Sequence, residues 1–121
     1  MPPKRIPAEV GRLAVTAALA GLKPDLATAT RYLLQVLAEH AEGNTVEVRV
    51  PPFGAVQAVE GPRHTRGTPP NVIETDATTW LALATGGTTW AQAVASGAVS
   101  ASGARADLTA YLPLTWGTMD E

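Results

Sequence analysis

The first forty residues repeat apolar positions with the period of a helix. Small and apolar side chains recur every three or four positions over residues 8–22, and Gly21 and Pro24 end this predicted helix. The same spacing resumes after Asp25, which we expect to be the N-cap of a second helix running to about Ala41. This part of the chain therefore predicts a helical hairpin.

The spacing of apolar residues then changes to the alternation of a strand. In the stretch TVEVRVP, three valines alternate with Glu47 and Arg49, which predicts a strand with one buried face. PPFG forms the turn, AVQAVE returns as a second strand, and NVIET predicts a third after a loop rich in glycine and proline.

Two short helices are predicted next. Asp76 can cap a helix over ATTWLALATG that ends at Gly86, and Thr89 with Gln92 has the spacing of a capping box for a helix that ends at Gly97. AVSASG predicts a fourth short strand, and RADLTAYLPL predicts a last helix.

The order of these elements indicates the fold class. Strands that follow one another in a block, instead of alternating strictly with helices, indicate an α+β domain in which helices cover one face of an antiparallel sheet. Because 121 residues is an ordinary size for one domain, we expect residues 1–121 to form a single domain, with flexible ends at residues 1–7 and 116–121.

Composition narrows the class of function. Only 17% of the residues are charged and the formal net charge is -2, which argues against nucleic-acid binding. The basic start followed by LAVTAALAGL has the outline of a secretory signal, but Glu9 and Arg12 interrupt it. Cysteine is absent and no stretch approaches the roughly 20 apolar residues that span a bilayer, so we expect a cytoplasmic protein without stable membrane insertion.

Metal and catalytic chemistry have few candidate residues. The chain has two histidines, His40 and His64, on different predicted elements, so we expect no metal site. No Gly-x-Ser-x-Gly stretch is present, and the glycine patterns do not fit a nucleotide-binding loop. We therefore expect neither a cofactor nor enzymatic activity.

The segment from residue 76 to residue 114 has a recognisable series of motifs. It holds an acidic residue, two helices that each end in glycine, a glycine after the last strand, and spaced leucines. The matching pieces are Asp76, Leu81–Gly86, Ala93–Gly97, Gly103, Leu108 and Leu112. This series resembles the carboxy-terminal half of the sterol carrier protein family, although residues 103–107 replace the usual Gly-Asp pair. With VPPFGAVQAVEGPRHTRGTPPNVIETD included, the chain is most similar to the bacterial sterol carrier protein ortholog branch.

The resemblance implies both a fold and a ligand class. It implies a sterol carrier protein-like α+β fold, with an antiparallel sheet of about five strands and helices packed on one face. Between the layers it implies an apolar tunnel for a lipid, a fatty acyl chain or a sterol-like molecule. The residues that we expect to line the tunnel are Leu81, Leu83, Trp90, Val94, Leu108 and Leu112.

An alternative function fits the same residues. Alanine-rich helices can approach a sheet closely and leave no cavity, and the chain would then be an accessory or protein-interaction module. The carboxy-terminal domain of mycothiol-dependent maleylpyruvate isomerases also resembles this fold, and there a separate helical bundle carries zinc. This chain lacks the histidines of that bundle.

The loop EGPRHTRGTPPNV concentrates polar groups in a chain of low charge. Arg63, His64 and Arg66 could turn toward one anion, such as the head group of a ligand or an anionic substrate. They could equally pair with nearby carboxylates, or the prolines could stiffen a loop that binds a partner protein. The sequence leaves these three interpretations open.

Overall fold

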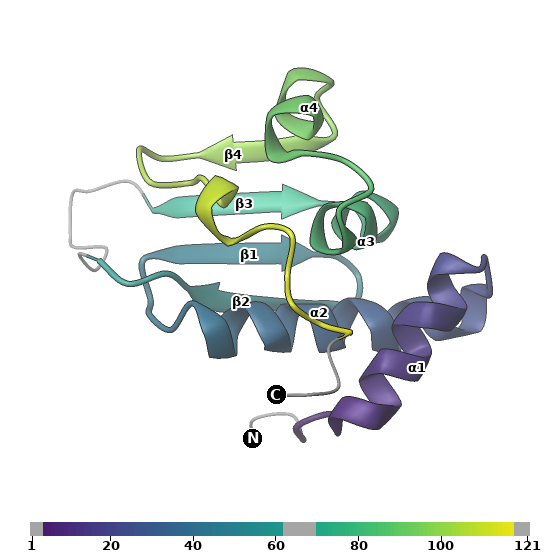
Figure 1. Cartoon of the computed structure of the whole chain (residues 1–121). Helices are drawn as coiled ribbons and strands as arrows, with labels where there is room; N and C mark the ends of the chain where they lie inside the picture. The colour runs from purple at the N-terminus through teal and green to yellow at the C-terminus, as the bar shows by residue number, and fades with distance from the viewer. Residues whose placement is uncertain (1–3, 62–69, 118–121) are drawn as a thin grey trace.

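The computed structural model describes residues 4–61 and 70–117, and Figure 1 shows how their elements are arranged. The helices and turns are α1 (Ala8–Leu19), the 3-10 turn η1 (Lys23–Asp25), α2 (Leu26–His40), α3 (Ala77–Thr85), α4 (Trp90–Ala95) and the 3-10 turn η2 (Thr109–Tyr111). The strands are β1 (Val46–Val50), β2 (Gly54–Ala58), β3 (Asn71–Thr75) and β4 (Val99–Ser102).

The strands form one sheet in the order β2-β1-β3-β4. The outer pairs are antiparallel, whereas β1 and β3 run parallel, with Val46 opposite Asn71. The α+β fold class is therefore confirmed. Within the described residues the sheet differs from the expectation in having four strands and a parallel central pair. The alternation of valines identifies the buried face of a strand, but it carries no information on the partner strand or its direction.

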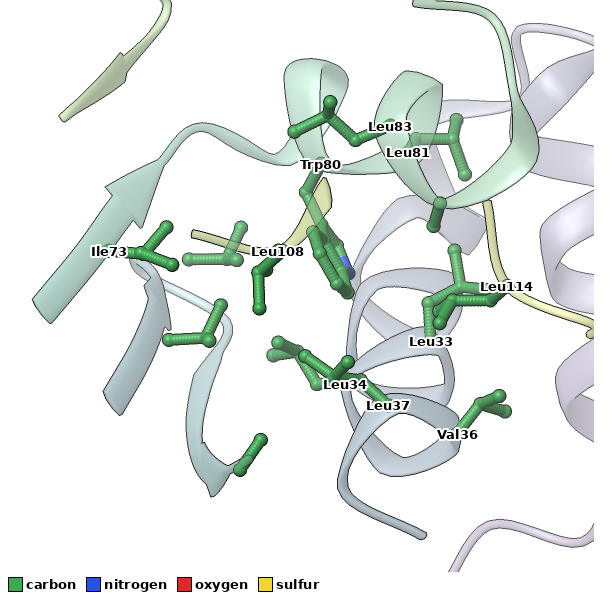
Figure 2. Packing of buried hydrophobic residues seen from close by; sticks show 14 of the residues in the cluster. Leu33, Leu34, Val36, Leu37, Ile73, Trp80, Leu81, Leu83, Leu108 and Leu114 are labelled. Carbon is green, nitrogen blue, oxygen red and sulfur yellow. The ribbon is translucent and has the colours of Figure 1, made fainter. Parts of the chain in front are cut away.

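The core lies between this sheet and α2. The three valines of β1 are fully buried, as their alternation predicts, and Leu33 and Leu37 of α2 belong to the same apolar cluster. Figure 2 shows the side chain of Trp80, from α3, between Leu108 and the leucines of α2. Its indole nitrogen donates a hydrogen bond of 3.3 Å to the backbone oxygen of Thr30, so the buried polar atom has a partner.

Helix α1 packs against α2 through a glycine. A Cβ atom at Gly11 would collide with the ring of Tyr32, which is buried. A side chain at this position would therefore hold the two helices apart, and the predicted hairpin closes because none is present.

Both ends of the described chain contact the rest of the molecule, while the expected flexibility of residues 1–7 and 116–121 stays a prediction. The backbone N–H of Ile6 donates to the side-chain oxygen of Gln35 at 2.8 Å, and the Gln35 amide donates to the oxygen of Ile6 at 2.9 Å. Trp116 is half-buried against the core. Residues 4–7 thus lie along α2.

The predicted helix caps are confirmed in part. The Asp76 side chain accepts a hydrogen bond of 2.8 Å from the backbone of Thr79, and Thr89 forms the complete capping box with Gln92. Asp25 occupies the N-cap position of α2, as predicted, but its side chain makes no capping hydrogen bond, and a 3-10 turn leads into the helix.

The predicted last helix is a single 3-10 turn, η2. The Asp107 carboxylate accepts a hydrogen bond of 2.8 Å from the backbone N–H of Thr109, which competes with a longer helix. Leu112 is extended, as a residue before proline prefers, and this ends the turn before Pro113. The spacing of apolar residues therefore predicts a longer helix than the structure has.

Candidate ligand-binding groove

The residues predicted to line a tunnel fall into three environments. Leu83 and Leu108 are 1% and 0% exposed, and Leu81 and Trp90 are also buried in the core cluster. Leu112 is half-buried, whereas Val94 is 42% exposed. Figure 2 shows Leu108 next to Trp80, with Leu81 and Leu83 above them on α3. The hollows described below have other lining residues, so a tunnel lined by these six side chains stays a prediction.

The second predicted site, with Arg63, His64 and Arg66, lies outside the described residues. The prediction of an anion-binding loop is therefore untested. His40, the other histidine, is exposed at the end of α2.

A groove of about 840 Å³ lies along α2, far in sequence from the predicted tunnel residues. One face of α2 contributes six residues at helical spacing: Thr28, Arg31, Leu34, Gln35, Ala38 and Glu39. Residues 4–7 with Val10 form one wall, and Phe53 with the first residues of β2 forms the other. Figure 1 shows α2 running between β2 and the segment that leads into α1. The groove therefore joins three parts of the chain that are distant in sequence.

Most of the groove surface is apolar. Ile6, Pro7 and Val10 contribute apolar atoms from one wall, and Phe53 and Val56 contribute them from the other. Val10 is 48% exposed, so α1 presents an apolar side chain to solvent where it borders the groove. A volume of this size and such walls are typical of small-molecule sites.

The absence of a side chain at Gly54 keeps the β2 side of the groove open. A Cβ atom built at Gly54 would lie 3.5 Å from Cδ1 of Leu34 and 3.8 Å from Cγ of Arg31, both of which line the groove. These are ordinary contact distances, so a larger side chain would extend into the groove without a backbone clash. Gly54 is therefore a suitable position for blocking the groove.

Charged side chains stand at the two ends of the α2 face. The guanidinium of Arg5 donates two hydrogen bonds to the Glu39 carboxylate, at 2.7 and 3.1 Å. These bonds are the main reason that the pKa of Glu39 lies below its usual value. At the other end, Nε of Arg31 donates to the backbone oxygen of Phe53 at 3.0 Å.

Two smaller hollows offer less room for a ligand than the groove along α2. One, of about 390 Å³, lies between α1 and the carboxy-terminal segment and includes Leu13 and Trp116. The other, of about 350 Å³, lies beside Glu47, Arg49 and Glu74 and is lined by charged and turn residues.

In the described part of the chain, no three His, Cys, Asp or Glu side chains are placed to hold a metal ion. Within the same residues, no helix has the length and apolar character needed to cross a membrane.

The sequence contained a weak signal for the groove. On α2, Arg31, Gln35 and Glu39 fall off the apolar core face, and Leu34 and Ala38 lie among them on the helix surface. A helix side with this mixture is more often simply solvated, and nothing in the sequence placed residues 4–10 or β2 beside it.

Comparison with known proteins supports the resemblance seen in the sequence. The model of a family described as bacterial SCP ortholog, where SCP denotes sterol carrier protein, matches residues 23–114. The match runs from η1 to just beyond η2, so residues 4–22 with α1 lie outside it. No match was found among curated proteins.

Proposed function

The chain belongs to the bacterial SCP ortholog family, and from this premise we propose that it binds an apolar or amphipathic small molecule without transforming it. The ligand class is a lipid, a fatty acyl chain or a sterol-like molecule, as the resemblance to sterol carrier proteins implies. The proposal includes a single domain that acts in the cytoplasm and uses no cofactor. One apolar cluster that runs from Ala14 to Leu114 supports the single domain.

The groove along α2 is the observation that carries this proposal. It has the volume of a small-molecule site, its walls are mostly apolar, and Gly54 leaves room beside Leu34. Burying an alkyl chain contributes about 0.8 kcal/mol per methylene group, so even partial burial of a short tail is favourable before ordering costs.

The site predicted around α3 remains a second proposed location for the ligand. Leu81, Leu83 and Leu108 would have to move apart to admit a tail, because they are packed in the core. In the groove along α2, a tail needs no such rearrangement. The groove is therefore the location that we propose first.

Narrowing the groove tests this location. We expect Gly54→Leu to weaken binding of a fluorescent dodecanoate analogue by about tenfold, because the added side chain occupies the space beside Leu34. Gln57→Leu is the matched control, since Gln57 is exposed on the same strand and does not line the groove. The measurement is a fluorescence titration of both variants and the unmodified protein.

The outcomes separate the proposals. Unchanged binding by Gly54→Leu would place the ligand elsewhere, with the site around α3 as the next location to block. A protein that binds no probe at all contradicts the small-molecule function and favours the alternative, an accessory or protein-interaction module that presents the loop with Arg63, His64 and Arg66.

A further inference from the structure

The two ends of the groove differ in charge. At one end Glu39 is already neutralised by Arg5, and at the other end Arg31 has no carboxylate partner within residues 4–61 and 70–117. Arg31 and Glu39 are eight positions apart on α2, which corresponds to about 12 Å along the helix axis. The groove is therefore long enough to separate a polar head from an apolar tail.

Arg31 lines the groove with most of its N–H donors available. An arginine has five N–H donors, and the hydrogen bond from Nε to the Phe53 backbone uses one of them. Its remaining N–H groups have no partner in the described chain. A guanidinium fixed in this way suits a carboxylate or a phosphate, which it can bind through two parallel hydrogen bonds.

The groove carries positive charge in a chain that is negative overall. Its lining includes Lys4, Arg5 and Arg31 but only one carboxylate, Glu39, whereas the whole chain has a formal net charge of -2. This local excess favours an anion over a neutral or cationic group of the same size.

From this charge and shape we infer that the groove selects single-chain amphiphiles with an anionic head, which Arg31 holds while the tail lies between Leu34, Ala38 and Val56. The inference rests on the proposed function, and it places the head-group site on α2 instead of on the loop that contains Arg63. The occupant is a small amphiphile because the groove volume of about 840 Å³ lies within the range of small-molecule sites.

Paired ligands of equal chain length test the inference. Amide shifts in NMR spectra are followed during titration with dodecanoate and with dodecan-1-ol, both below their aggregation limits. We expect dodecanoate to bind about fivefold more tightly than dodecan-1-ol, and Arg31→Gln to remove this preference because its cost falls mainly on the anionic ligand. The preference should also weaken as salt is raised.

Arg49→Gln is the matched control for the loss of one positive charge. Arg49 is an exposed arginine on β1 that pairs with Glu47 at 2.9 Å and does not line the groove. Its replacement should leave the preference for dodecanoate intact. If Arg31→Gln lowers stability in a thermal melt, Arg31→Lys takes its place. We expect a smaller loss of the preference for dodecanoate, because lysine keeps the charge but cannot form two parallel hydrogen bonds as a guanidinium does.

Different titration results would overturn the anionic head site and the proposed function. Equal affinities for the two ligands, or an equal effect of Arg49→Gln, would overturn the anionic head site while leaving the proposed function in place. Shifts confined to α3 and α4 would also overturn it, because the ligand would then lie outside the groove. Absence of any shift with either ligand would remove the proposed function itself.

Discussion

At Gly11, helix propensity and side-chain packing give opposite expectations for how a change to alanine affects stability. Replacing glycine by alanine inside a helix usually stabilises it by about 1 kcal/mol, because the backbone loses less freedom on folding. Here the added methyl group would overlap the Tyr32 ring. Overpacking of this kind usually costs about 1–3 kcal/mol, so steric overlap should decide the sign.

We therefore expect Gly11→Ala to lower the free energy of unfolding by about 1 kcal/mol in urea denaturation. In a Tyr32→Ala background the same change should be neutral or stabilising, because the colliding ring is gone. A gain in stability from Gly11→Ala in the unmodified protein would contradict the packing of α1 on α2.

Single residues also explain which local predictions succeeded. Asp76 and Thr89 cap their helices as predicted, because a capping interaction involves only three or four consecutive residues. Asp107 shows the limit of such reasoning. Its carboxylate binds the backbone of Thr109 and favours a short turn where apolar spacing indicated a helix.

Among the elements, the segment before α1 depends on a pH-sensitive contact. Arg5 lowers the pKa of Glu39 through their hydrogen bonds, so this contact stabilises the folded chain above the ordinary glutamate pKa of about 4.3. The contribution is lost as the pH falls through the lower pKa of the folded state. Because both side chains are exposed, the effect on global stability is small.

The measurement is an NMR titration of the Glu39 carboxyl carbon together with the Ile6 amide. We expect the midpoint of Glu39 to lie below the ordinary value and to return toward it in Arg5→Gln. The Ile6 amide should report loosening of the segment in acid through its bond to Gln35. A Glu39 midpoint that is the same in both proteins would show that Arg5 does not pair with it in solution.

For the whole molecule, local and long-range features differ in how far the sequence predicts them. The helical hairpin, the first three strands and the two short helices follow from patterns within about ten residues, and the structure has them near their predicted bounds. The parallel pairing of β1 with β3 joins residues more than twenty positions apart, so no local pattern indicates it.

The groove was missed for the same physical reason. It forms where residues 4–10, α2 and β2 meet, and only their folded arrangement places Val10, Leu34 and Val56 around one space. The residues that the sequence predicts to line a tunnel lie in the carboxy-terminal half, where the family motifs are concentrated. Leu83 and Leu108 from that set are buried in the core cluster, and their role in lining a tunnel stays a prediction.

The most direct test of the central claim, that this chain carries a small amphipathic or apolar molecule, is native mass spectrometry of gently purified protein. The account predicts discrete added masses of a few hundred daltons on the 12.5 kDa chain, which organic extraction removes and identifies as molecules with an apolar tail. A bare chain that also stays bare after incubation with dodecanoate would contradict it.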